Sequence, residues 1–196
     1  MKNKLLFIYI LIIYILLPIL IFYNAALFKY KFYILTMAGL LIYILLKVNN
    51  INNKDLGIRK KNILKSLKRN IPMILLFIII IIIFKLFDLN KYTPTETIFF
   101  YLFYIFLSCP IQEFLYRGIF GYFENTLIKN KYVMFLLSSF CYSFVHIIYK
   151  DILTCILTFL FGIVLYLLYR KDYNLLGVSI SHIILGILTI YLGIVN

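Results

Sequence analysis

Residues 71–87 have the sequence IPMILLFIIIIIIFKLF, in which Lys85 is the only charged side chain. At about 1.5 Å per residue, a helix of this length crosses most of the roughly 30 Å hydrocarbon core of a bilayer. Similar apolar runs occupy residues 5–23, 32–48, 133–149, 152–169 and 175–195, and another begins near residue 94. The sequence therefore predicts an all-α integral membrane protein, a bundle of about seven transmembrane helices.

The composition excludes a water-soluble globular domain. Of the 196 residues, 64% are hydrophobic and only 14% are charged, whereas a soluble domain carries about a quarter charged residues. The three cysteines lie in apolar runs and form no C-x-x-C motif, so we expect them to be packing residues. The first apolar run is too long for a signal peptide and lacks a clear cleavage site, so a retained first span is favoured.

The net charge of +13 is concentrated between the apolar runs. Residues 49–70 are rich in lysine and arginine, and Ile63, Leu64 and Leu67 recur at helical spacing, so this segment is either an interfacial amphipathic helix or a solvated loop. Such segments contact anionic membrane lipids and favour the cytoplasmic side, and nucleic acid is not expected as a partner. This pattern predicts a multi-pass cell-membrane protein with its N-terminus in the cytoplasm and its C-terminus outside.

This pattern divides the chain into three predicted parts. Residues 1–48 form an N-terminal transmembrane hairpin, residues 49–70 a basic cytoplasmic or interfacial loop, and residues 71–196 the transmembrane core. Thr93 to Glu96 predict the start of the fourth span, with Thr93 as N-cap and Glu96 closing a capping box. Pro110 lies inside that span and removes one backbone hydrogen bond, so we expect a kink just before Gln112.

Polar side chains interrupt the later apolar runs at three places. Ionisable groups are costly to place in a bilayer, and both histidines of the chain lie among them, so they indicate a functional site. The groups are Gln112, Glu113 and Arg117 on the fourth span, Tyr142 and His146 on the fifth, and His182 on the last.

These groups form a plausible catalytic set. Glu113 and Arg117 share a helix face and can form an ion pair. A carboxylate and an imidazole can activate water while a second imidazole stabilises an oxyanion. We therefore predict Glu113, His146 and His182 as catalytic residues, with Glu113 and His146 activating water and His182 supporting the oxyanion, although each alone would more often serve helix packing. The supporting residues are then Gln112, Arg117 and Tyr142. No H-E-x-x-H motif supports a metal site, so neither a metal nor another cofactor is expected.

The three motifs resemble those of the CPBP family of intramembrane proteases, named for CAAX and bacteriocin processing and also called the Abi family. The family pattern is E-E-x-x-x-R on one span, F-x-x-x-H on the next and H-x-x-x-N or D on the last. Residues 112–117 match the first motif except that Gln112 replaces the first glutamate. The second motif has Tyr142 in place of phenylalanine, and the third has Gly186 at the Asn/Asp position.

The resemblance implies a glutamic-type endopeptidase that hydrolyses a hydrophobic or membrane-associated peptide. In the family, the first glutamate and the second-motif histidine form the base, and the third motif steadies the oxyanion. Because Gln112 is an amide and Gly186 has no side chain, three readings stay open. Glu113 takes over as base, or the chain is a catalytically impaired relative that binds peptide as an immunity or scaffold protein. A small transporter or channel subunit is the third.

Overall fold

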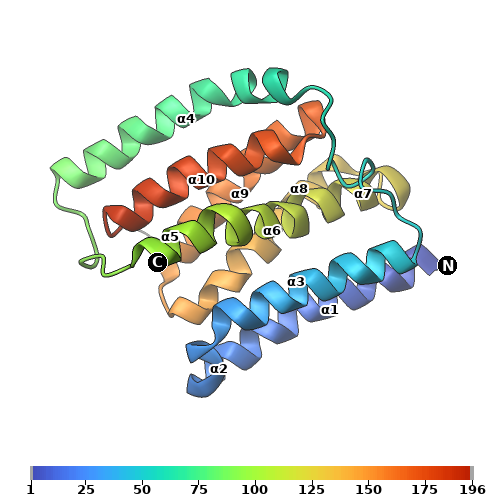
Figure 1. Ribbon diagram of the computed structural model, residues 1–196, viewed down its shortest axis with the longest axis horizontal. Coiled ribbons are helices and arrows are strands. Elements are labelled where there is room, and N and C mark those ends of the chain that lie inside the picture. Colours follow the sequence, from blue (N-terminus) through green and yellow to red (C-terminus); the bar gives the residue numbers. More distant parts are fainter. Residues whose placement is uncertain (1, 195–196) are drawn as a thin grey trace.

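The computed structural model describes residues 2–194, and in that range the chain is helical with no strand. Six helices are long and apolar enough to span a membrane, and the last helix is shorter but also apolar. They form one bundle, which confirms the predicted all-α membrane fold (Figure 1). In chain order the elements are α1 (Lys2–Tyr23), α2 (Ala25–Lys29), α3 (Lys31–Val48), α4 (Ile63–Leu86), α5 (Ile98–Phe103), η1 (Tyr104–Ser108), α6 (Cys109–Glu113), η2 (Phe114–Gly118), α7 (Ile119–Thr126), α8 (Lys131–Phe144), η3 (Val145–Tyr149), α9 (Ile152–Asp172) and α10 (Leu175–Tyr191).

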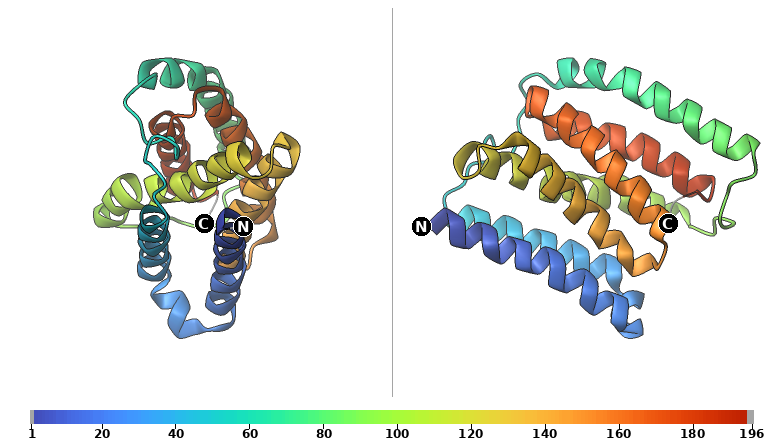
Figure 2. Two further views of the ribbon diagram at one scale, coloured as in Figure 1. Left: turned by 90° about the vertical axis from the view of Figure 1, so that its right-hand side faces the viewer. Right: turned by 180° about the vertical axis from the view of Figure 1, so that it is seen from behind.

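The fourth span, which runs continuously through α5, η1, α6, η2 and α7, lies at the centre of the bundle. On one side it contacts α10, which in turn packs against α4. On the other side it contacts α3 of the N-terminal hairpin, and α8 and α9 pair closely behind it. The bundle is therefore layered from α4 through the central span to the hairpin (Figure 2). α10 ends at the opposite end of the bundle from the start of α1 (Figure 1).

Two helix starts differ from the sequence prediction. α4 begins at Ile63 rather than at Ile71, so the amphipathic part of the basic segment is the first turns of a spanning helix. The predicted capping box at Thr93 is wrong, because the fourth span begins at Ile98 with Thr97 at its N-cap. Lys91 N–H donates to the carbonyl of Gly193, and Glu96 accepts from Thr95 N–H. This segment is thus tied to the end of α10 instead of starting a helix.

Two π-helical segments, η1 and η2, interrupt the fourth span. η1 ends at Ser108, two residues before Pro110, so the expected break in the helix takes the form of a π segment. A π segment shifts the backbone hydrogen bonds by one residue and leaves a carbonyl without its usual donor. Side chains from other helices fill this role at η2. Tyr14 Oη donates to Leu115 O at 2.8 Å, and Ser138 Oγ donates to Tyr116 O. These bonds fix how the central helix is rotated.

The basic loop before α4 is bound to the junction between α9 and α10. Leu175 N–H donates to Gly57 O at 3.0 Å, and the Asn174 side-chain amide donates to the carbonyls of Arg59 and Lys61 at 3.0 and 2.8 Å. The side-chain oxygen of Asn174, Oδ1, also accepts from the N–H groups of Leu176 and Gly177 in the first turn of α10. One side chain therefore caps α10 and anchors the loop.

We expect Asn174→Ala to lower the free energy of unfolding by about 3 kcal/mol, since an N-cap contributes about 1 kcal/mol and each hydrogen bond to the loop about 1 kcal/mol. Asn130→Ala is the matched control, because Asn130 caps α8 in the same way but makes no bond to a loop. It should lose only about 1 kcal/mol. Thermal unfolding in detergent measures both. Equal losses in the two variants would contradict the anchoring role.

Candidate active site

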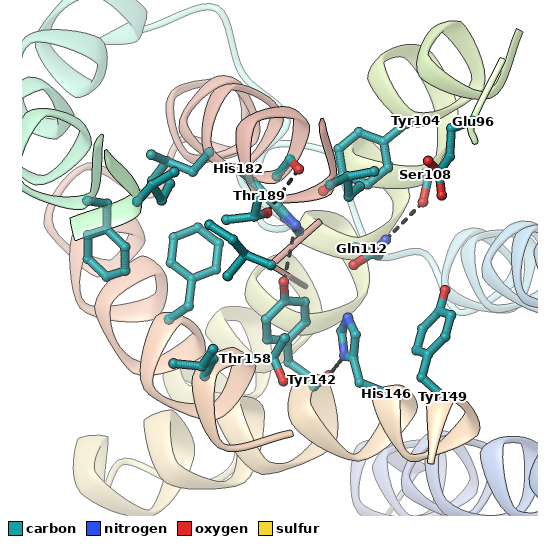
Figure 3. A pocket seen from close by; sticks show the side chains of 18 of the residues that line it. Glu96, Tyr104, Ser108, Gln112, Tyr142, His146, Tyr149, Thr158, His182 and Thr189 are labelled. Carbon is teal, nitrogen blue, oxygen red and sulfur yellow. Dashed lines mark hydrogen bonds between the residues drawn. The ribbon is translucent and has the colours of Figure 1, made fainter. Parts of the chain in front are cut away.

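A cavity of about 700 Å³ opens beside the central span (Figure 3). Its lining comes from the second halves of α4 and α10, the first halves of α5 and α9, and the α2–α3 corner. Most of these side chains are aromatic or aliphatic, so the cavity is mainly apolar. Polar groups gather at its inner end, where they come from the central span, α8, η3 and α10. They include Ser108, Gln112, Tyr142, His146 and His182.

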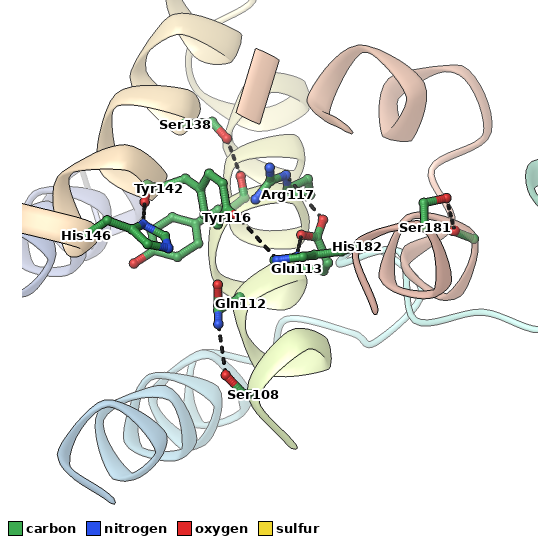
Figure 4. A network of polar contacts seen from close by, with 11 residues as sticks. Ser108, Gln112, Glu113, Tyr116, Arg117, Ser138, Tyr142, His146, Ser181 and His182 are labelled. Carbon is green, nitrogen blue, oxygen red and sulfur yellow. Dashed lines mark hydrogen bonds and ion pairs between the residues drawn. The ribbon is translucent and has the colours of Figure 1, made fainter. Parts of the chain in front are cut away.

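Behind this inner wall lies a buried charged cluster (Figure 4). Glu113 Oε1 lies 2.6 Å from His182 Nδ1, and Glu113 Oε2 lies 3.2 Å from Arg117 Nε. Glu113 and Arg117 are fully buried, and His182 is 3% exposed. A carboxylate in such a place must be paired, because an isolated buried charge is strongly destabilising. The two partners of Glu113 supply this pairing from two different helices.

Gln112 and Glu113 are consecutive residues of the central helix, but they lie on opposite sides of the inner wall of the cavity. Successive helical side chains point about 100° apart, so Glu113 faces α10 while Gln112 faces the cavity. Gln112 is partly exposed and lines the cavity, whereas Glu113 is absent from the lining. Gln112 Nε2 donates to Ser108 Oγ at 2.9 Å, one turn earlier. The amide of Gln112 is thereby held with its carbonyl oxygen free.

His146 lies on the 3-10 segment η3 and also lines the cavity. Its Nδ1 is 2.8 Å from the carbonyl oxygen of Tyr142. A carbonyl can only accept, so Nδ1 must carry the proton and donate. In neutral His146 the other nitrogen, Nε2, then has a free lone pair. This is the tautomer that a base acting on water needs.

Tyr142 connects the two histidines. Its hydroxyl lies 3.1 Å from His182 Nε2, and its ring lies at an angle to both imidazoles, with centroids 5.2 Å from His146 and 5.6 Å from His182. The Arg117 guanidinium sits 4.3 Å above the same ring in a cation–π contact. Tyr142 thus contacts both histidines and Arg117, and through His182 it is connected to Glu113.

All six residues singled out from the sequence meet in this region, but not in the expected pairs. The sequence analysis placed Glu113 beside His146 as a water-activating pair. The Glu113 carboxylate instead contacts His182 and Arg117, and His146 reaches this cluster through Tyr142. The catalytic roles of the residues stay predictions.

Tyr104 is a cavity residue that sequence reasoning missed. It lines the cavity beside Gly186, and its ring packs edge-on against His182 with centroids 6.2 Å apart. A Cβ built on Gly186 would overlap the Tyr104 hydroxyl. The phenol of Tyr104 therefore fills the space beside His182 that a larger residue at position 186 would need. Gly186 among the bulky residues 183–191 was the signal available in the sequence.

The far end of the cavity carries charge. Lys31 lines it with its ammonium group 4.0 Å from the ring centre of Phe28 and 4.7 Å from that of Phe32. Glu96 and Tyr92 lie at the same end. Burial, with a smaller contribution from the Glu96 carboxylate, raises the pKa of Tyr92 to about 12, so its phenol is neutral at physiological pH. Within residues 2–194, no group of three His, Cys, Asp or Glu side chains is placed to hold a metal ion.

The fold and the site define a multi-pass membrane protein with a polar, histidine-containing site at the inner end of an apolar cavity, the class to which intramembrane proteases belong. The family model described as Rce1-like, type II CAAX prenyl endopeptidase Rce1-like, matches residues 94–188. The matched segment contains all three motifs, and it confirms the resemblance to the CPBP family of CAAX proteases. Neither the curated proteins nor the solved structures gave a match.

We expect Glu113→Ala to destabilise the protein by about 3–5 kcal/mol, because it leaves the Arg117 charge buried without its carboxylate. Replacing both partners, as in Glu113→Leu with Arg117→Met, should restore much of this loss, since a buried ion pair and well-packed apolar residues often have similar stability. Thermal unfolding of the purified variants in detergent gives both values. A double variant no more stable than the single one would contradict a role of the pair in charge compensation.

Proposed function

We propose that this protein is an intramembrane endopeptidase that hydrolyses a peptide bond in a hydrophobic or membrane-associated peptide. The observation that carries the proposal is the meeting of Gln112, His146 and His182 at one end of a large apolar cavity, although they come from three separate spans. The match of residues 94–188 to a CAAX endopeptidase family supports the same reaction class.

In this proposal His146 is the general base. Its Nδ1–H is held by the Tyr142 carbonyl, so Nε2 accepts a proton from water as the water oxygen attacks the peptide carbonyl. Gln112 cannot take the proton, but its free amide oxygen can accept a hydrogen bond from the same water and orient it. The imidazolium of His146 then returns the proton to the leaving amine when the C–N bond breaks.

The oxyanion is stabilised by Tyr142, with His182 and Glu113 behind it. In this proposal His182 carries a proton on each ring nitrogen, so that Nδ1–H donates to the Glu113 carboxylate and Nε2–H donates to Tyr142 Oη. The hydroxyl proton of Tyr142 is thereby free to point into the cavity toward the developing negative charge. Glu113 acts here as a positioning residue, because its carboxylate does not reach the cavity.

The cavity lining indicates what kind of peptide would bind. Aromatic and aliphatic residues make up most of the wall, including Phe77, Phe84 and Phe161, and they suit apolar substrate side chains. The basic loop lies at the other end of the bundle, on the side that we assign to the cytoplasm by its charge. The protein then lies in the cell membrane with its N-terminus inside.

Gln112→Glu should raise the rate of peptide hydrolysis by about 100-fold, because general bases contribute about 10²–10⁴ and a second carboxylate would share the proton with His146. Gln112→Met, which keeps the side-chain length, should lower the rate. His146→Ala should abolish hydrolysis in both backgrounds. The assay uses an internally quenched library of hydrophobic peptides in proteoliposomes, with cut sites assigned by mass spectrometry. Cleavage that survives His146→Ala, or no cleavage even by Gln112→Glu, would refute the proposal.

Tyr142→Phe should lower kcat by about 10²–10³-fold with little change in KM, as expected when one oxyanion donor is lost. The ring and its contact with Arg117 remain, but His182 Nε2 loses its hydroxyl partner, so the free energy of unfolding should fall by about 1–3 kcal/mol. Tyr169→Phe is the control, since Tyr169 is likewise buried but lines neither cavity. An equal loss of kcat in both variants would argue against a specific role of the Tyr142 hydroxyl.

A further inference from the structure

A second, smaller cavity of about 90 Å³ lies between the N-terminal hairpin and the central span. The hairpin contributes Leu17, Thr36 and Ala38 to its wall, and the core contributes Tyr116 and Val145, among others. Five residues line both this cavity and the large one. They are Phe32, Ser108, Gln112, His146 and Tyr149.

Gln112 and His146 therefore stand in the partition between two chambers of different size. The large chamber is mainly apolar and has room for peptide side chains. The small one is too narrow for a peptide, but at about 30 Å³ per molecule it holds about three waters. The imidazole and the amide in the partition are accessible from both sides.

We propose that the small cavity is a water chamber that supplies the hydrolytic water to His146. A buried water needs two to four polar partners, and the wall offers the Thr36, Ser108 and Tyr149 hydroxyls beside the partition groups. The lone pair of His146 Nε2 and the Gln112 carbonyl oxygen are further acceptors. Most of the wall is apolar, and wholly apolar cavities of this size stay dry, so these few polar groups decide whether water occupies the chamber.

The division separates the two reactants. A water from the small chamber gives one proton to His146 Nε2, and its oxygen bonds to the carbonyl carbon of a peptide held in the large chamber. The apolar chamber then needs no water channel of its own, which a bound hydrophobic peptide would block. This catalytic part rests on the proposed peptidase function, whereas the hydration of the small chamber does not.

The inference also gives the N-terminal hairpin a role. The family model covers residues 94–188, so α1 and α3 lie outside the matched segment. They nevertheless form the wall of the small cavity that faces Gln112 and His146, and Thr36 contributes a hydroxyl group to it. The hairpin is thus one wall of the reaction site and more than a membrane anchor.

Radiolytic hydroxyl-radical labelling tests the hydration directly, because radicals formed from bound water oxidise the side chains beside it. Tyr14 and Tyr116 line the small chamber and are each 5% exposed, whereas Tyr169 is fully buried and lines neither chamber. We expect Tyr14 and Tyr116 to be labelled several-fold faster than Tyr169. Ala38→Leu, which fills the chamber, should remove this difference. The neighbouring Met37→Leu should not, because Met37 is 56% exposed on the outer face of α3.

Turnover then tests the catalytic part. Ala38→Leu and Thr36→Val should each lower kcat about 10-fold without changing KM, while Met37→Leu keeps the wild-type rate. Labelling of Tyr14 and Tyr116 no faster than that of Tyr169, or unchanged by Ala38→Leu, would overturn the water chamber, whether or not the chain cleaves peptides. A hydrated chamber whose filling leaves kcat intact would overturn the supply of water to His146. Absence of any peptide cleavage would instead overturn the proposed function, and the labelling result would still decide the hydration.

Discussion

The rest of the structure depends on one constraint, that the Glu113 carboxylate is held in the interior of a membrane bundle. A charge at this depth persists only when it is paired. Arg117 pairs with it from one turn further along the same helix, and His182 from α10. The central span must therefore be rotated so that position 113 faces α10. The π segment η2 and the hydrogen bonds to its carbonyls from Tyr14 and Ser138 hold that rotation.

Once Glu113 faces α10, the adjacent Gln112 must face elsewhere, and the geometry of a helix turns it toward the cavity. The first motif thus combines a residue that stabilises the bundle, Glu113, with a residue that lines the large cavity, Gln112. This separation explains why the bundle keeps its buried cluster even though Gln112 stands where the CPBP pattern has its first glutamate. The change alters the chemistry of the cavity wall, while the ion pair behind it is intact. The lack of a side chain at Gly186 leaves no void, because the Tyr104 phenol fills the space beside it.

Sequence reasoning found what local patterns encode. Long apolar runs gave the membrane bundle, and the isolated polar groups gave all six residues that meet around the cavity and the buried cluster. It failed where contacts between segments far apart in the sequence determine where a helix starts or which side chains pair. The start of the fourth span depends on Lys91 binding the end of α10, and a capping motif alone does not reveal that. The pairing of Glu113 with His182 joins residues 69 positions apart. Tyr104 has no mark in the sequence except the glycine opposite it.

The two halves of the bundle are packed differently, and this determines how a peptide can approach. Toward the basic loop, Phe120, Phe123, Tyr166 and Tyr169 are fully buried and fill the interior. None of them lines either cavity. The large cavity therefore extends only toward the other end, where Lys31 and Glu96 lie. A peptide that reaches His146 must enter from that end or from the surrounding lipid, so the polar cluster is also the floor of the cavity.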